Sequence, residues 1–384
     1  MSFEFATAGR IVFGDGAVEQ LGAVAAALGS RPLLVTGSSA DRAAPAVAQL
    51  EDAGLEWTSF TVAGEPRVAD VERGVEAARE AGSDMVVAFG GGSALDAAKA
   101  IAALATNTGP ILRYLEVIGE AQPLETDPLP SVALPTTAGT GSEVTRNAVV
   151  ASPDDQVKVS LRHPAMLPDV ALVDPRLTHG VPPAVTAATG LDALTQVIEP
   201  LLSHRASPLT DGLCREAIPR AAEALPRAFR DGGDAAARAD MSLASMFGGL
   251  ALANAGLGAV HGFAGPLGGM HDAPHGAICG RLLPLVMEAN VAALREREPD
   301  NPVLDRFVEV AELLTGQPGA SVDDGVRWIQ DLCEELAVPG FASYGMTADD
   351  VPAAVEAARR SSSMKGNPIT LTDEELAGVL TRAL

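Results

Sequence analysis

The fold is decided by residues 84–96, which read DMVVAFGGGSALD. Asp84–Phe89 is almost wholly apolar, which predicts a strand buried on both faces of a parallel sheet. Three glycines follow, and a helix is predicted to begin with Ser93 as N-cap and Asp96 at its third position. Glycines let the backbone approach a ligand closely, and the first N–H groups of a helix attract anions. We therefore predict that this turn binds a phosphate group; the alternative is a tight turn that binds no ligand.

Strands and helices alternate on both sides of this segment, which indicates a doubly wound parallel sheet covered by helices. The predicted strands are Arg10–Phe13, Arg31–Thr36, Trp57–Val62, Asp84–Phe89 and Ser131–Leu134. The predicted helices between them are Ala17–Leu28, Asp41–Ala53, Val68–Ala81 and Ser93–Leu104. In such sheets ligands bind at the carboxyl ends of the strands.

From about Val181 the sequence changes to long segments rich in Ala, Leu, Glu and Arg, with apolar residues at helical spacing. The predicted helices are Val185–Leu202, Thr210–Ala228, Ala235–Ala253, Val303–Leu314, Asp323–Leu336, Asp349–Ala358 and Asp373–Leu384. We therefore expect two domains: an α/β domain over residues 1–178 and an all-helical domain over residues 179–384.

Composition narrows the classes of function. The formal net charge of −23 over 384 residues argues against nucleic acid and anionic membranes as partners. Three scattered cysteines without CxxC spacing are typical of reduced thiols, and the N-terminus lacks the pattern of a signal peptide. We expect a cytoplasmic protein.

Two further loops carry polar groups at the ends of predicted strands. The first loop is Gly37-Ser38-Ser39, which has small residues and no acidic residue that could bind a ribose 2′-hydroxyl. These small residues leave room for a 2′-phosphate on that ribose. The alternative is a plain connecting loop. Pro135–Glu143, reading PTTAGTGSE, places four hydroxyls among glycines and suits an amide, ribose or phosphate.

Candidate metal ligands lie in the helical half. His261 and His275 stand fourteen residues apart among small residues, and Asp192 is an acid within an apolar helical run. Two imidazoles and one carboxylate suit Zn²⁺ or Fe²⁺ and leave a position open for substrate. Two widely spaced histidines form a weak motif, so packing or helix capping remains an equal alternative on these residues alone.

Four features together resemble the iron-containing (group III) alcohol dehydrogenase family. They are GGGSALDAAKA at residues 90–100, LPTTAGTGSEVT at 134–145, ATGLDALTQVIE at 188–199, and the pair of His261 and His275. The match runs from RIVFGDGAVEQLG to SSSMKGNPITLT with the motifs in the expected order. The resemblance implies a dinucleotide-binding domain, a helical domain, and NAD(P)-dependent oxidoreduction at a divalent metal.

The resemblance also implies roles for single residues. Gly91, Gly92, Ser93 and Asp96 would hold the pyrophosphate side of the cofactor. Thr136, Thr137, Thr140 and Thr145 would lie along the adenine and nicotinamide-ribose path, and Lys158 would reach the ribose. Asp192, His261 and His275 would be metal ligands. Small residues at positions 37–39 are common among NADP users of the family, whereas an aspartate there marks members that prefer NAD.

Two positions depart from the family pattern. Gln196 occupies the place of a fourth metal ligand, a histidine one helical turn after the aspartate. The side-chain carbonyl oxygen of Gln196 can ligate a metal only weakly. A related branch of the family uses a zinc site with three protein ligands, so Gln196 argues against iron more than it argues against metal binding. Gly265 stands where many members have a histidine beside the nicotinamide. His271 lies nearby and could replace it as a proton relay; a surface histidine is the alternative.

We therefore predict a metal-dependent alcohol dehydrogenase or aldehyde reductase using NADP or NAD, with Fe²⁺ or Zn²⁺, on a small alcohol or carbonyl substrate. The resemblance suggests a homodimer. A metal-independent reductase of the maleylacetate reductase type is the closest alternative. A lyase resembling dehydroquinate synthase and a non-catalytic NADPH-binding protein are more distant ones.

Overall fold

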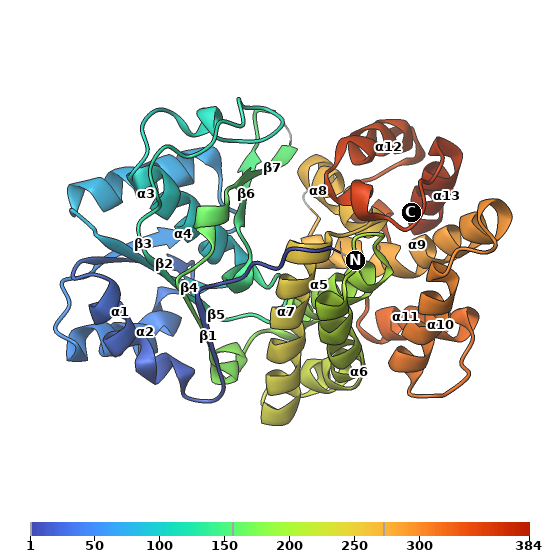
Figure 1. The fold of residues 1–384 in the computed structure, drawn as a ribbon, viewed down its shortest axis with the longest axis horizontal. Coiled ribbons are helices and arrows are strands. Elements are labelled where there is room, and N and C mark those ends of the chain that lie inside the picture. The colour runs from blue at the N-terminus through green and yellow to red at the C-terminus, as the bar shows by residue number, and fades with distance from the viewer. Residues whose placement is uncertain (1, 156, 272) are drawn as a thin grey trace. The chain divides into compact units, whose positions relative to one another are not determined.

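The computed structural model describes residues 2–155, 157–271 and 273–384. It divides into two compact units. One is Ala6–His179; the other comprises Gly180–Leu384 together with the N-terminal residues up to Phe5. Figure 1 labels the helices and strands of both units.

The first unit contains a six-stranded sheet in the order β1-β8-β5-β4-β2-β3, in which every neighbouring pair is parallel. Its strands are β1 (Arg10–Phe13), β2 (Pro32–Gly37), β3 (Thr58–Val62), β4 (Met85–Gly90), β5 (Ser131–Pro135) and β8 (Val170–Val173). The predicted central strand is therefore present as β4, buried over its whole length between β2 and β5.

Helices cover both faces of this sheet (Figure 1). Leu33 and Val35 of β2 point to the face packed by α3 and α4, whereas Leu34 between them packs with α1 and α2. This alternation follows from the two-residue period of a strand, and two apolar faces require two helical layers. The doubly wound fold is confirmed. The helices are α1 (Leu21–Leu28), α2 (Ala44–Asp52), α3 (Val68–Glu80) and α4 (Gly92–Ala105).

An antiparallel pair that the sequence analysis did not predict follows β5. Strands β6 (Asn147–Ser152) and β7 (Val157–Arg162) form a separate two-stranded sheet in which Val150 faces Val159. Residues alternate between buried and less buried along β6, the pattern of a strand with one covered face. Its buried side packs into the same apolar cluster as α4.

The second unit contains helices and no strand among its described residues, as predicted. Its long helices are α5 (Pro183–Leu202), α6 (Pro208–Arg230), α7 (Ala235–Ala255), α8 (Ala259–His271), α9 (His275–Arg297), α10 (Val303–Thr315), α11 (Val322–Glu335), α12 (Val351–Arg360) and α13 (Asp373–Ala383). Helices α8 and α9 were not predicted, because glycines and Pro266 and Pro284 interrupt their helical pattern. Tertiary packing outweighs that weak propensity here, since most of both helices is buried.

Helix α9 is long and apolar enough to cross a membrane by length and composition alone. However, 78% of its most apolar window is buried inside the structure, as expected for the core helix of a globular unit. It carries His275 in its first turn, so the core of the unit fixes the position of a candidate ligand.

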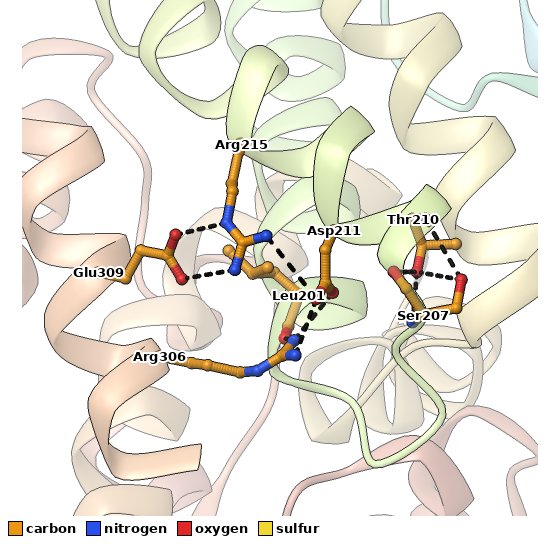
Figure 2. Close-up of polar contacts among 7 residues, drawn as sticks. All are labelled: Leu201, Ser207, Thr210, Asp211, Arg215, Arg306 and Glu309. Atoms are coloured by element: carbon orange, nitrogen blue, oxygen red, sulfur yellow. Dashed lines mark hydrogen bonds and ion pairs between the residues drawn. The ribbon is translucent and has the colours of Figure 1, made fainter. Parts of the chain in front are cut away.

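A charged network joins three helices of this unit (Figure 2). Both terminal nitrogens of Arg306 on α10 donate to the carboxylate of Asp211 on α6, each at 2.8 Å. Arg306 also donates to the carbonyl of Leu201 near the end of α5, at 2.7 Å, and Arg215 lies between Asp211 and Glu309. Bidentate arginine–carboxylate pairs fix orientation as well as distance, so this network sets how α10 lies on α5 and α6.

Candidate active site

Three helices of the second unit bring together four side chains of types that can bind a metal ion. Asp192 comes from the middle of α5, His261 from α8, and His275 and Cys279 from the first turns of α9. One donor atom from each lies within 4.8 Å of the donors of the other three. The three residues singled out in the sequence therefore lie next to one another, and Cys279 joins them.

Asp192 is at the centre of this group. Its Oδ1 lies 3.1 Å from Nε2 of His261 and 3.7 Å from Nε2 of His275. Burial alone would raise the pKa of Asp192, but the charge on His275 and the hydrogen bond from His261 outweigh burial and lower this pKa. A carboxylate that stays ionised in a buried site requires a positive partner. That partner is either the protons on the two imidazoles or a metal cation that takes the place of those protons.

Glu199 orients His261 from behind. Its Oε2 lies 2.6 Å from Nδ1 of His261, and its Oε1 accepts the backbone N–H of Val260 at 2.8 Å. Nδ1 is thus held by a carboxylate while Nε2 faces Asp192, the arrangement in which an imidazole ligates a metal through Nε2. Glu199 was not predicted from the sequence, although it lies seven residues after Asp192 on the same face of α5.

Gln196 lies one helical turn after Asp192 and is buried. A hydrogen bond from its side chain also lowers the pKa of Asp192. Its Oε1 is a buried acceptor with no hydrogen-bond partner within the described part of the chain, and it lies beside Gly248 of α7. Two imidazoles, a carboxylate and a thiol whose donor atoms lie within 4.8 Å of one another fit a divalent cation such as Zn²⁺ or Fe²⁺.

His271 is the last residue of α8 and does not belong to this group of donors as far as the described residues show. Its Nε2 is buried, and none of the residues that the structure describes hydrogen-bonds to it. Gly265 lies six residues before His271 on α8, and a Cβ built on Gly265 would meet no atom within 4 Å. The missing side chain at position 265 therefore leaves open space.

In the first unit, the glycine turn (residues 90–93) and the threonine loop (residues 135–143) leave the same edge of the sheet. Gly90 at the end of β4 pairs with Pro135 at the end of β5, and the backbone N–H of Thr136 donates to the carbonyl of Gly90 at 2.8 Å. Gly91 is the N-cap of α4. The glycine turn and the threonine loop, predicted separately, thus lie side by side.

Close packing between these loops explains two of the glycines. A Cβ on Gly91 would lie 3.2 Å from Oγ1 of Thr137, and a Cβ on Gly92 would lie 2.7 Å from Oγ1 of Thr140. Any side chain on Gly92 would displace Thr140. The glycines therefore serve loop packing as well as close approach to a ligand.

The expected capping box at Ser93 and Asp96 was wrong. Helix α4 begins at Gly92 and no side chain caps it. Asp96 instead accepts hydrogen bonds from the hydroxyl of Ser142 and the backbone N–H of Val149, and it lies 3.2 Å from Nζ of Lys99. Long-range partners outcompete a local cap, and Asp96 ties the threonine loop and β6 to α4.

Lys99 completes this network from inside. Its buried Nζ donates to the carbonyl of Ser142 at 2.9 Å and to Oγ1 of Thr145 at 3.1 Å. Burial lowers the pKa of Lys99, against the opposing charge of Asp96. Thr145, predicted to lie along the cofactor, is thus held by an internal amine.

The remaining predicted cofactor residues lie at the end of β2, in the turn after it, and on β7. Ser38 and Ser39 are exposed after β2, and a Cβ on Gly37 would meet no atom within 4 Å, so this turn is uncrowded. Lys158 of β7 forms an ion pair with Glu65 at 2.7 Å. Its side chain is therefore paired within the first unit.

Known proteins match the chain over nearly its whole length. Residues 8–175 match the family model for iron-containing alcohol dehydrogenase, and residues 186–384 match the C-terminal model of the same family. A probable alcohol dehydrogenase, EutG, of Escherichia coli (strain K12) is 37% identical over 96% of this chain and 92% of its own length. The 1,3-propanediol dehydrogenase of Klebsiella pneumoniae is 34% identical over 97% and 96%. The crystal structure of a 1,3-propanediol oxidoreductase superimposes with a TM-score of 0.92 at 32% identity, covering 100% of both chains.

Proposed function

The chain belongs to the iron-containing alcohol dehydrogenase family, and on that premise we propose that Asp192, His261 and His275 hold one divalent cation. Membership makes the chain an NAD(P)-dependent alcohol oxidoreductase that interconverts small alcohols and carbonyl compounds. The proposal concerns how its own residues serve that reaction. In it, residues 1–178 bind the dinucleotide, and residues 179–384 supply the metal ligands and the substrate pocket.

One observation carries the proposal: four donor atoms from three helices converge within 4.8 Å, and all of their side chains except the partly exposed His275 are buried. Helices that merely pack would bury apolar side chains there, because an ionised carboxylate is costly to bury without a positive partner. A divalent cation held there supplies Lewis-acid polarisation of the substrate oxygen. Asp192 contributes negative charge, and Glu199 keeps Nε2 of His261 directed into the site.

The proton that leaves the alcohol oxygen needs an acceptor. We assign this role to His271, because its Nε2 lacks a hydrogen-bond partner among the described residues and so keeps its lone pair or proton for substrate or water. The open space at Gly265 leaves room for such a path on the same helix.

On the cofactor side, the N-terminus of α4 and the backbone at Gly91, Gly92 and Ser93 suit the pyrophosphate. The adjoining threonine loop lines the cofactor path beside them with Thr136, Thr137 and Thr140. This loop is held in place by Asp96, Lys99 and Thr145.

The ribose is contacted by Lys158, whose side chain leaves its ion pair with Glu65 when the cofactor binds. The uncrowded turn at Gly37–Ser39 lacks an acidic residue and favours NADP over NAD.

Three further assignments complete the proposal. The ion is Fe²⁺ or Zn²⁺, with Gln196 supporting Asp192 rather than providing a strong ligand. The enzyme is a cytoplasmic homodimer, and none of its three cysteines forms a disulfide within the described structure, as expected in a reducing compartment.

The test is a rate measurement with metal removed and restored. Oxidation of NADH and NADPH by short aldehydes is followed with purified protein, with chelator-treated protein, and after addition of Zn²⁺ or Fe²⁺. Activity should fall on chelation, return with metal, and be higher with NADPH. His275→Ala should lose more than about 100-fold in turnover even with metal added, while its cofactor affinity, measured by fluorescence titration, stays near that of the wild type.

The exposed His204 provides the matched control, because His204→Ala removes an imidazole from the same unit without touching the site. Full activity of the chelated wild type would contradict the metal role. It would favour the metal-independent reductase considered from the sequence.

A further inference from the structure

Cys279 stands apart from the other cysteines in its surroundings. It lies four residues after His275, on the same face of α9, and is fully buried. Its Sγ lies 3.7 Å from Oδ1 of Asp192 and 3.8 Å from Nε2 of His261. A buried cysteine usually packs as a small apolar residue, whereas this sulfur faces a carboxylate and an imidazole.

The distances match those between ligands of one ion. Zinc bonds of about 2.3 Å to sulfur and about 2.1 Å to nitrogen or oxygen, at tetrahedral angles, separate sulfur from N or O by about 3.6 Å and N from O by about 3.4 Å. The structure places Sγ 3.7 and 3.8 Å from its neighbours, and Asp192 Oδ1 3.1 and 3.7 Å from the two imidazole nitrogens. These four separations lie within a few tenths of an ångström of the tetrahedral values, and the two remaining pairs, His261–His275 and His275–Cys279, lie within 4.8 Å, so all four donors can converge on a single cation.

Charge also favours the sulfur over Gln196. Among the direct ligands, neutral imidazoles leave Asp192 as the single negative charge against a divalent cation, and the neutral amide of Gln196 would add no charge. A thiolate would bring the ligand set to two negative charges and neutralise the ion in a buried site. The amide oxygen of Gln196 lies beside Gly248 of α7 instead.

We propose that Cys279 is the fourth protein ligand of the cation in this chain, bound through its sulfur. The inference rests on the proposed function, since it concerns the same ion. On binding, the S–H bond breaks as the sulfur–metal bond forms, one proton passes to solvent, and no redox change occurs. Sulfur ligation selects Zn²⁺ over harder divalent ions such as Mg²⁺ and Mn²⁺. Zinc accepts a fifth donor, so the substrate oxygen still has a place.

The test is an absorption spectrum of the full-length protein loaded with Co²⁺. A thiolate ligand gives Co²⁺ an intense near-ultraviolet charge-transfer band, whereas nitrogen and oxygen ligands give only the weak visible bands. The wild type should bind one Co²⁺ per chain and show the intense band. Cys279→Ser should keep the weak bands and lose the intense one, and its Zn²⁺ affinity should fall by about 100-fold or more.

Two variants serve as controls. Cys333→Ser removes another thiol that contacts α9, where its Sγ donates to the carbonyl of Gly280 at 3.3 Å, and it should keep the intense band. Gln196→Ala should keep it as well, because the amide is not the fourth ligand. Circular dichroism establishes that each variant is folded, and Cys279→Ala replaces the serine variant if that one is not.

The outcomes separate this proposal from the one on which it rests. A wild type that binds one Co²⁺ without the intense band would overturn sulfur ligation and leave the three-ligand metal site standing. An intense band that persists in Cys279→Ser would also overturn it. If the wild type binds no more Co²⁺ than the His275→Ala variant does, the proposed metal site is wrong, and sulfur ligation by Cys279 is wrong with it.

Discussion

Replacing Glu143 by glutamine tests how the threonine loop is held. Glu143 lies in the loop that connects β5 to β6 and is only 2% exposed. Burial raises the pKa of its carboxyl from 4.5 to about 7, although its own backbone N–H and the charge of Lys99 act in the opposite direction. The folded protein therefore resists ionisation of this side chain up to neutral pH.

The sign and size of the effect follow from proton linkage. Below pH 4.5 the carboxyl is protonated in both folded and unfolded chains and has no effect on stability. From pH 4.5 to about 7 only the unfolded chain releases the proton, so the free energy of unfolding falls by about 1.4 kcal/mol per pH unit. Above pH 7 the full cost is about 3 kcal/mol. Glu143→Gln removes the ionisable group and should recover that amount.

The assay is thermal unfolding of the wild type and Glu143→Gln at pH 5 and pH 8. At pH 8 the variant should melt roughly 6–12 °C higher, since 1 kcal/mol moves the midpoint of a domain of this size by about 2–4 °C. At pH 5 the two should differ by less than about 3 °C. Glu76→Gln, on the exposed face of α3, controls for replacing a carboxylate by an amide in water. A gain that is equal at both pH values, or a loss at pH 8, would refute the reasoning.

Three further predictions concern the helical unit. Glu199→Gln should weaken metal binding by about 10- to 100-fold, because His261 on α8 loses its carboxylate partner. A metal-buffered titration measures the affinity. An unchanged affinity would contradict the role of Glu199. Gly276→Ala should destabilise the protein by about 1–3 kcal/mol, because its Cβ would lie 1.8 Å from the carbonyl oxygen of Ala188; an unchanged melting temperature would contradict that packing. Asp211→Asn should lower the free energy of unfolding by about 1.5–3 kcal/mol, since it removes the charge-assisted hydrogen bonds to Arg306 (Figure 2). Denaturant unfolding measures this loss. A loss well below that range would mean that the network contributes little to stability.

Much of the first unit could be predicted from the sequence because its signals are local. The apolar run at β4 and the glycines after it specify a central strand and a turn without knowledge of any other segment. The hairpin of β6 and β7 was missed because it forms a second sheet outside the parallel alternation. The cap at Ser93 failed because Asp96 has partners about fifty residues away, which no local pattern contains.

The candidate site was predictable in part for the same reason. Asp192 could be placed on a helix by periodicity, and the two histidines were notable by their type. Glu199 and Cys279 were missed, although each lies at helical spacing from a residue already singled out, seven after Asp192 and four after His275. That spacing assigns a side chain to a face of its own helix, but only the packing of α5, α8 and α9 shows which faces meet.

Anomalous diffraction from crystals grown with Zn²⁺ tests the central claim most directly. Data collected on either side of the zinc absorption edge locate the ion without assumptions about its ligands. We predict one strong peak per chain within bonding distance of Asp192, His261 and His275. A zinc peak bonded to other residues, or a fully loaded protein with no peak at these three side chains, would contradict the account.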